Sequence, residues 1–218
     1  MISSEQEYEQ FRSPPELLLF WKQCCESLTD EEWRLRKGTV AKRIVEELGP
    51  IAFFAMKYYR PGLEVLVRGL VGNQPYDGEI QVSGWRERSF KIEVANAIEY
   101  EDALRRELLH CEGSSPGWGA IKRENGKVTA EGGAHSYGED LARLGKISAE
   151  RFSAKQSEHA YENGTVLIIQ FDFHRSISHN EFDLLKAPLR EAISLNGCQF
   201  AEVHVFNSCD NELRKVSP

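Results

Sequence analysis

The sequence lacks the patterns that mark several large classes of protein. Its cysteines are odd in number, irregularly spaced and free of any CxxC pair, which predicts reduced thiols rather than a disulfide scaffold or a zinc site. No stretch approaches the roughly 18–20 apolar residues that span a bilayer. The acidic first residues contain no apolar run of the kind that a secretory signal needs. We therefore expect a cytoplasmic protein with no membrane partner.

Common catalytic and nucleotide-binding motifs are also missing. The chain contains no Gly-x-Ser-x-Gly elbow, no phosphate-binding Walker loop and no dinucleotide fingerprint. Basic residues are outnumbered, with 27 Lys and Arg against 34 Asp and Glu, for a formal net charge of -7. This balance argues against a protein that coats nucleic acid nonspecifically, but it leaves room for a small basic cleft on an acidic body.

What is present is the composition of an ordinary globular chain. The 218 residues are 41% hydrophobic and 28% charged, enough to bury one sizeable core. We expect a flexible N-terminus over residues 1–12 and a single α/β domain over 13–218. Within that domain the pattern predicts a helical lead-in at 13–60 and a core at 63–206, interrupted by a glycine-rich insert at 113–138.

The order of the predicted elements defines the fold class. Pro14-Pro15 opens one helix, and a capping box from Thr29 to Glu32 opens another, which Gly49-Pro50 is expected to end. A short third helix follows. Alternating residues then predict three strands in an antiparallel meander. After them come a helix, a hairpin around Gly126 and further helices that alternate with two strands.

This order predicts a mixed central sheet of about five strands flanked by helices. The three meander strands are expected at 63–71, 77–83 and 90–95, and the two later strands at 165–171 and 200–206.

Two carboxylates in the meander are candidates for a metal site. Asp77 begins the second predicted strand and Glu93 lies within the third, on the same strand face as Lys91. If these strands pair, the two carboxylates converge near a strand end. Oxygen ligands of this kind suit Mg²⁺, which could polarise a phosphodiester and activate a water. Lys91 would orient that water or neutralise charge.

The runs Pro75–Ile80 and Phe90–Ala95 resemble the PD-(D/E)xK nuclease core, in an element order that is similar over residues 35–206. The resemblance implies a restriction-endonuclease-like fold, a metal-dependent phosphodiester hydrolase and a helical glutamate, here Glu46 or its neighbour Glu47. It also implies that the helix at 139–160, with Lys155 and Tyr161, and the strand after it form the second half of the fold. Ala95 stands where the family usually has lysine, a place that Lys91 could fill from the same strand face.

Plainer interpretations stay open beside this one. Asp77 can be a turn aspartate, Glu93 a solvent-facing strand residue and Lys91 a guard of a strand edge. The alternative function is then a catalytically inactive nuclease-fold protein that acts as a binding or assembly module, with a protein rather than a nucleic acid as its partner. Two weaker candidates are an aromatic lid at Gly117-Trp118-Gly119 and the pair Asp172 and His174, for which ordinary structural roles are favoured.

Overall fold

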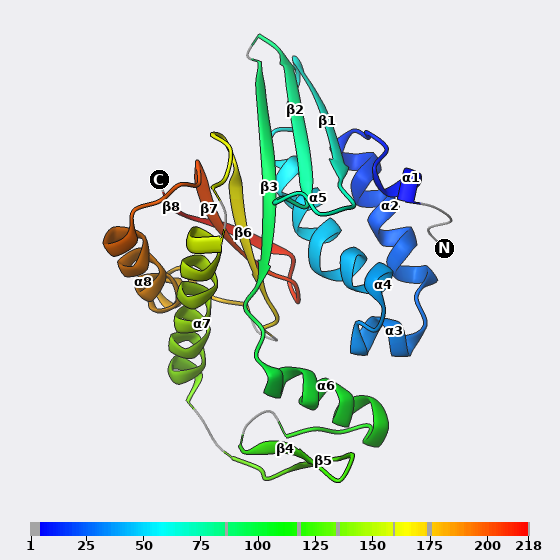
Figure 1. The fold of residues 1–218 in the computed structure, drawn as a ribbon, viewed down its shortest axis with the longest axis vertical. Helices are drawn as coiled ribbons and strands as arrows, with labels where there is room; N and C mark the ends of the chain where they lie inside the picture. Colours follow the sequence, from blue (N-terminus) through cyan, green and yellow to red (C-terminus); the bar gives the residue numbers. More distant parts are fainter. Residues whose placement is uncertain are drawn as a thin grey trace.

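A mixed sheet of six strands forms the centre of the molecule (Figure 1). The computed structural model describes residues 5–85, 87–116, 119–133, 136–158, 160–173 and 176–217. The strand order is β1-β2-β3-β6-β7-β8, so the α/β class is confirmed but the expected number of strands is too low. The additional strand, β8, lies at the C-terminal edge. The bounds are β1 Leu63–Gly69, β2 Gly78–Gly84, β3 Arg88–Asn96, β6 Val166–Phe171, β7 Glu202–Asn207 and β8 Glu212–Ser217.

The sheet changes direction at β3. The strands β1, β2 and β3 pair antiparallel as the predicted meander, whereas β6 pairs parallel to β3 and β7 parallel to β6. The last strand, β8, returns antiparallel to β7. The carboxyl ends of β3, β6 and β7 therefore meet at one edge of the sheet, and parallel sheets commonly bind their ligands at that edge.

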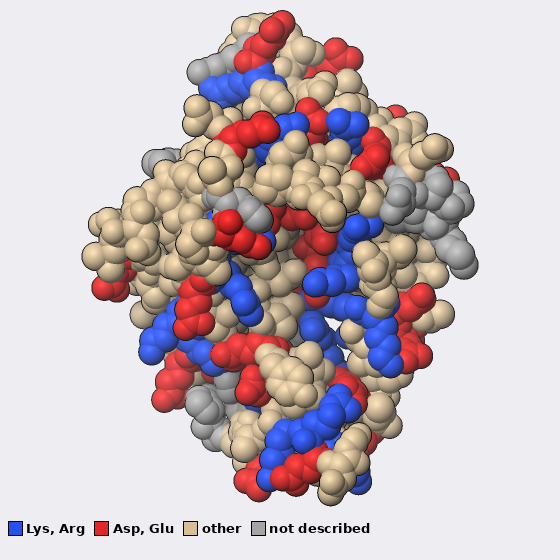
Figure 2. Space-filling model, in the orientation of Figure 1, with Lys and Arg blue, Asp and Glu red and all other residues tan. Residues whose placement is uncertain are grey.

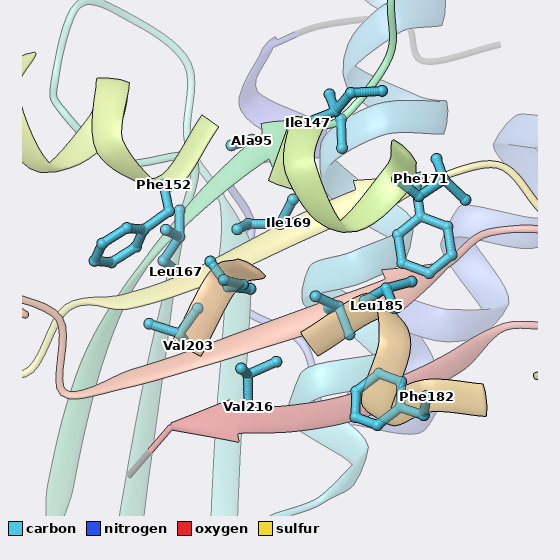
Figure 3. Packing of buried hydrophobic residues seen from close by; sticks show 14 of the residues in the cluster. Ala95, Ile147, Phe152, Leu167, Ile169, Phe171, Phe182, Leu185, Val203 and Val216 are labelled. Carbon is cyan, nitrogen blue, oxygen red and sulfur yellow. The ribbon is translucent and has the colours of Figure 1, made fainter. Parts of the chain in front are cut away.

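Hydrophobic side chains cover both faces of the sheet. Leu167 and Ile169 of β6 face α7 (Tyr137–Glu158) and α8 (His179–Asn196), as Figure 3 shows for the cluster around Phe152 and Leu185. The alternate residues of β6 face the other cluster, which contains α2 and α5. This two-sided burial explains the near-continuous apolar run of β6.

The helices on the second face differ from the predicted pattern. The bounds are α2 Pro14–Ser27, α3 Asp30–Leu35, α4 Thr39–Arg43, the π-helical turn η1 Ile44–Leu48 and α5 Gly49–Met56. The capping box at Thr29 is confirmed, but Gly49-Pro50 does not end the helix, because α4, η1 and α5 follow one another without a break. Pro50 lacks an N–H, and the wider π turn just before it accommodates the missing donor.

A small module separates β3 from α7. It consists of α6 (Tyr100–Glu112) and the hairpin of β4 (Ile121–Glu124) and β5 (Lys127–Ala130), which confirms the hairpin predicted around Gly126. Positive φ angles at Asn125 and Gly126 suit the tight turn that joins the two strands. The hairpin packs on α6 in its own hydrophobic cluster and lies apart from the main sheet in Figure 1.

From residue 5 onward, the N-terminal segment packs against the body of the molecule. The short helix α1 (Glu5–Tyr8) buries Tyr8, and the backbone of Arg12 exchanges two hydrogen bonds with Val67, at 2.9 and 2.8 Å. The expected flexible segment thus packs against the outer edge of β1. Among the helices that the structure describes, none has both the length and the apolar character needed to cross a membrane.

Candidate active site

The pairing of β2 with β3 brings Asp77 beside Glu93. Gly78 pairs with Ile92, so Asp77, one residue earlier, continues the register opposite Glu93. The Asp77 N–H donates to the Ile92 carbonyl at 2.7 Å, and the Val94 N–H donates to Asp77 Oδ2 at 2.8 Å. The predicted convergence of the two strand positions is therefore present in the register.

A lysine from α7 contacts Glu93 of this pair. Lys155 Nζ lies 2.8 Å from Glu93 Oε1 and 3.0 Å from Glu158 Oε2. The Glu93 side chain is only 7% exposed, while that of Lys155 is 26% exposed. Burial and the charge of Asp77 raise the pKa of Glu93 to about 7, although Lys155 opposes the rise. Tyr161 lies close enough that the charge of Glu93 adds to burial in raising the pKa of its hydroxyl.

A third carboxylate approaches from the π-helical turn, and it belongs to Glu47. Burial, followed by the negative charge of Asp77, raises the pKa of Glu47 to about 8. Burial also raises the pKa of Asp77, against the Val94 N–H and the positive charge of Lys155. Burial, followed by the charges of Glu47 and Asp77, raises the pKa of the Tyr8 hydroxyl. Three acidic groups therefore share one poorly solvated region.

Lys91 lies elsewhere on the predicted strand face. It pairs in register with Glu79, and its ammonium lies 3.4 Å from Glu79 Oε1 and 4.8 Å from the centre of the Tyr76 ring. Glu79 also binds Arg68 at 2.9 Å. The ammonium that contacts Glu93 is that of Lys155, not that of Lys91. Ala95 packs in the hydrophobic cluster below α7, so its small side chain makes room for that helix.

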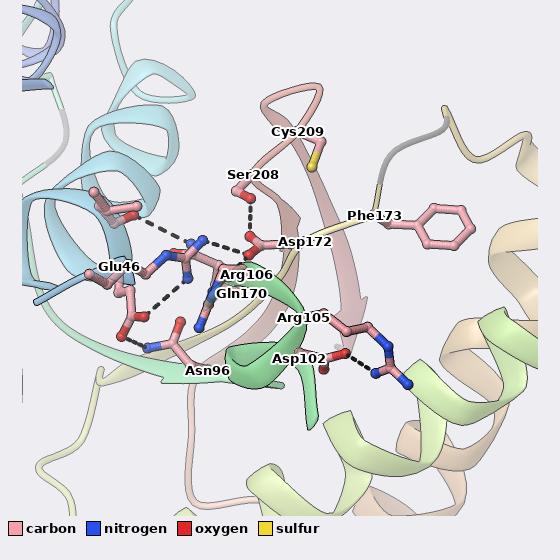
Figure 4. A network of polar contacts seen from close by, with 12 residues as sticks. Glu46, Asn96, Asp102, Arg105, Arg106, Gln170, Asp172, Phe173, Ser208 and Cys209 are labelled. Carbon is pink, nitrogen blue, oxygen red and sulfur yellow. Dashed lines mark hydrogen bonds and ion pairs between the residues drawn. The ribbon is translucent and has the colours of Figure 1, made fainter. Parts of the chain in front are cut away.

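Glu46 is turned away from the carboxylate pair. Its Oε1 accepts from Arg36 at 3.0 Å, and its Oε2 accepts from Asn96 Nδ2 at 2.9 Å. Of the two adjacent glutamates that the sequence offered for this role, Glu47 is the one whose charge interacts with Asp77. Glu46 belongs to a separate polar cluster, which Figure 4 shows at the carboxyl ends of the strands.

Acidic and basic side chains lie together in one hollow of the surface. Figure 2 shows a hollow between α7 and α4 in which acidic side chains lie deep, with basic side chains beside them. The positive charges of Lys42 and Arg43 on α4 lower the pKa of Asp77, against the effect of burial. Basic groups therefore lie near Asp77 on a chain whose formal net charge is -7, as the sequence allowed.

The donor set can be compared with what Mg²⁺ requires. Among the described residues, no group of three or more His, Cys, Asp or Glu side chains is arranged to hold a metal ion. Lys155 engages Glu93 and the Val94 N–H engages Asp77, so both carboxylates already have partners. Mg²⁺ is nevertheless usually held by only one or two carboxylates, with water and substrate phosphate as its other ligands. Asp77 and Glu93, opposite each other in the β2–β3 register, supply that number of carboxylates.

The sequence did not identify Lys155 as a site member, and it left the choice between Glu46 and Glu47 open, for different reasons. Lys155 lies far from Glu93 in sequence, and helical periodicity alone does not select which basic residue of α7 faces the sheet. Its position beside Glu158 and before Tyr161 offers only a weak signal. Glu47 could not be separated from Glu46, because the π turn changes the direction in which each successive side chain points.

Some candidates fall outside the described residues. These are Gly117 and Trp118 of the predicted lid, and His174 of the predicted pair with Asp172. Comparison of the chain with protein-family models, with curated proteins and with solved structures finds no match.

Proposed function

We propose that the chain is a metal-dependent phosphodiester hydrolase with a core of the PD-(D/E)xK, restriction-endonuclease-like type. The observation that carries the proposal is the contact of Lys155 with Glu93, beside Asp77. An antiparallel meander that bears these carboxylates, followed by a helix and a parallel strand, supports the same assignment. The lysine absent at Ala95 would then be supplied by α7.

The proposed roles follow from charge and burial. Asp77 and Glu93 would hold Mg²⁺, which when bound supplies the Lewis-acid charge that stabilises a phosphodiester under attack. The Lys155 ammonium, whose pKa is raised mainly by its bonds to Glu93 and Glu158 against the effect of burial, stays positive and can orient a water or a phosphate oxygen. Glu47, with a pKa of about 8, holds a proton at neutral pH and can exchange it with the site.

Replacing Lys155 tests this function. We expect Lys155→Met to lower metal-dependent cleavage of DNA or RNA by roughly 100-fold or more, because one preorganised cation near the reacting group contributes at least that much. Asp77→Asn should lose cleavage as well. Lys146→Met, at an exposed position of the same helix, is the matched control. Rates are measured on labelled oligonucleotides with Mg²⁺ or Mn²⁺, and thermal melting checks that each variant folds.

Lys91→Met decides between the two lysines. If this variant loses cleavage while Lys155→Met keeps it, the assignment of Lys155 is wrong and the sequence-based expectation for Lys91 holds. If the wild type cleaves neither DNA nor RNA with either metal, the hydrolase proposal fails.

A second function is favoured by one specific observation. The ion pair of Lys155 with Glu93 and the Val94 N–H bond to Asp77 satisfy both carboxylates without a metal. This arrangement suits a nuclease-like fold that has kept its shape for binding or assembly. In that case the oligonucleotides stay intact, and neither Mg²⁺ nor Mn²⁺ changes the melting temperature.

A further inference from the structure

Two arginines converge where the parallel strands end. Arg36 follows α3, and Arg106 lies on α6. Both contact Asp172, which comes directly after β6, and Arg36 also binds Glu46 of η1. We call this group, together with Ser208 after β7, the arginine cluster (Figure 4). It joins segments that lie far apart in the sequence.

Asp172 marks the centre of a strong anion-binding arrangement. Its Oδ2 accepts from Arg36 at 2.5 Å and from Arg106 at 3.3 Å, and its Oδ1 accepts from the Ser208 hydroxyl. Asn207 clamps the neighbouring backbone of Phe173 with two bonds of 3.0 Å. Donors from three segments therefore surround one carboxylate, and the same donor types bind phosphate oxygens.

The donors of Arg106 are incompletely used. The only bond from its guanidinium to a described residue is the 3.3 Å contact with Asp172, and its buried Nε has no partner within the described part of the chain. Burial and the nearby charge of Arg36 lower the pKa of Arg106. A guanidinium presents several N–H donors in a planar fork, so with one long bond most of the Arg106 donors have no partner among the described residues. The Arg106 side chain is 23% exposed, against 9% for Arg36, and so it is the accessible member of the pair.

The arginine cluster lies farther along β3 than the carboxylates of the candidate site, and its Asn96 projects from the opposite face of the sheet to Glu93. Glu46, which binds Arg36, precedes Glu47 in the π turn. Asn96, which binds Glu46, lies three residues beyond Glu93 on β3, or about 10 Å at the rise of a strand. Phosphates of one flexible nucleic-acid strand can bridge such a separation.

We propose that Arg106, supported by Arg36, binds a backbone phosphate of the substrate strand next to the one at Asp77 and Glu93. The proposal rests on the proposed function, since the substrate is the phosphodiester strand named there. Arg is suited to this role because its fork matches the oxygens of a phosphate. Asp172 competes with the phosphate for the same guanidinium and keeps the cluster neutral when no strand is bound.

This competition makes two replacements act in opposite directions. Arg106→Ala removes the phosphate ligand and weakens strand binding. Asp172→Asn keeps the shape of the side chain but removes the competing negative charge, so it tightens strand binding. If the cluster served only to hold the fold together, both replacements would damage it, and neither would strengthen binding.

The experiment measures binding without cleavage. Anisotropy of a fluorescein-labelled single-stranded oligonucleotide is recorded in EDTA over a series of salt concentrations, with the full chain and each variant. We expect Arg106→Ala to weaken binding about tenfold and to reduce the slope of log K against log salt by about 0.7, the value for one phosphate contact on a single strand. Asp172→Asn should bind several-fold more tightly. Lys122→Ala, at an exposed lysine of the hairpin, is the control and should bind like the wild type.

The outcomes separate this inference from the hydrolase. Thermal melting checks folding, and Arg106→Gln replaces Arg106→Ala if the latter unfolds. Wild-type affinity in the folded Arg106 variant, weakened binding in Asp172→Asn, or no binding by the wild type overturns the phosphate site. If binding depends on Arg106 but no strand is cleaved with Mg²⁺ or Mn²⁺, the hydrolase fails and the phosphate site stands. If the wild type cleaves and binding ignores Arg106, only the phosphate site fails.

Discussion

At the residue scale, several buried polar groups in this molecule are held by a partner from another element. His204 illustrates this away from the candidate site. Its ring is fully buried, its Nε2 lies 2.7 Å from Glu202 Oε2 and its Nδ1 lies 3.1 Å from Lys57 Nζ. An ammonium only donates, so Nδ1 accepts from Lys57 and Nε2–H donates to Glu202. The neutral imidazole therefore satisfies both neighbours.

His204 should make the protein sensitive to acid. Burial is the main cause that lowers the pKa of His204 to about 4, whereas an unfolded histidine titrates near pH 6.5. Between these values the unfolded chain binds a proton that the folded chain excludes. Stability is therefore fully present above about pH 6.5 and falls as the pH drops toward 4, by up to about 3 kcal/mol from this group.

Urea unfolding at several pH values measures this contribution. His204→Gln cannot titrate, so its free energy of unfolding should approach that of the wild type as the pH falls from 7 to 5. A difference between the two proteins that stays constant over this range would show that His204 does not titrate as its burial implies.

At the element scale, the contact of α1 with β1 is unusually close. A Cβ on Gly69, which ends β1, would lie within 2.6 Å of Cζ of the Tyr8 ring. Gly69 pairs with Gly78, the residue after Asp77, so this contact lies beside the candidate site. The absence of a side chain at Gly69 leaves room for the Tyr8 ring.

A double-mutant cycle tests this packing. We expect Gly69→Ala to destabilise the protein by about 1–3 kcal/mol, because the methyl group forces the Tyr8 ring from its place. In a Tyr8→Ala background the same methyl group meets no ring, so Gly69→Ala should cost much less. Free energies of unfolding of the four proteins give the coupling. Additive costs would mean that α1 does not pack on β1 in solution.

Elements whose pattern is local could be predicted from the sequence, and those that depend on long-range contacts could not. Strand alternation was enough to place Asp77 and Glu93 in adjacent strands, and a continuous apolar run identified β6. The pattern of β8 is short and polar on one side, so it becomes a strand only because β7 offers an edge. The π turn precedes Pro50 and changes the direction of successive side chains. Local sequence patterns therefore could not decide between Glu46 and Glu47.

At the scale of the whole molecule, the sheet places the candidate site between its two helical layers. Asp77 and Glu93 come from the meander, Lys155 from α7 on one face and Glu47 from the helices on the other. Folding of the whole chain is therefore needed to assemble the four groups. A ligand that binds all of them should stabilise the native state as a unit, since the unfolded chain has no such site.

Metal-dependent stability is the global measure of this assembly. Saturating Mg²⁺ or Mn²⁺ should raise the melting temperature of the wild type by about 5–10 °C, which corresponds to roughly 2–3 kcal/mol for a ligand near 100 times its Kd. Metal requires ionised carboxylates, whereas burial raises the pKa of the proposed ligand Glu93 to about 7. Below this value protons compete with the metal, so the stabilisation should grow from pH 6 to pH 8. Asp77→Ala should remove the shift at every pH. An equal shift in both proteins would indicate that metal binds elsewhere, whereas no shift at any pH would favour the binding or assembly module over the hydrolase.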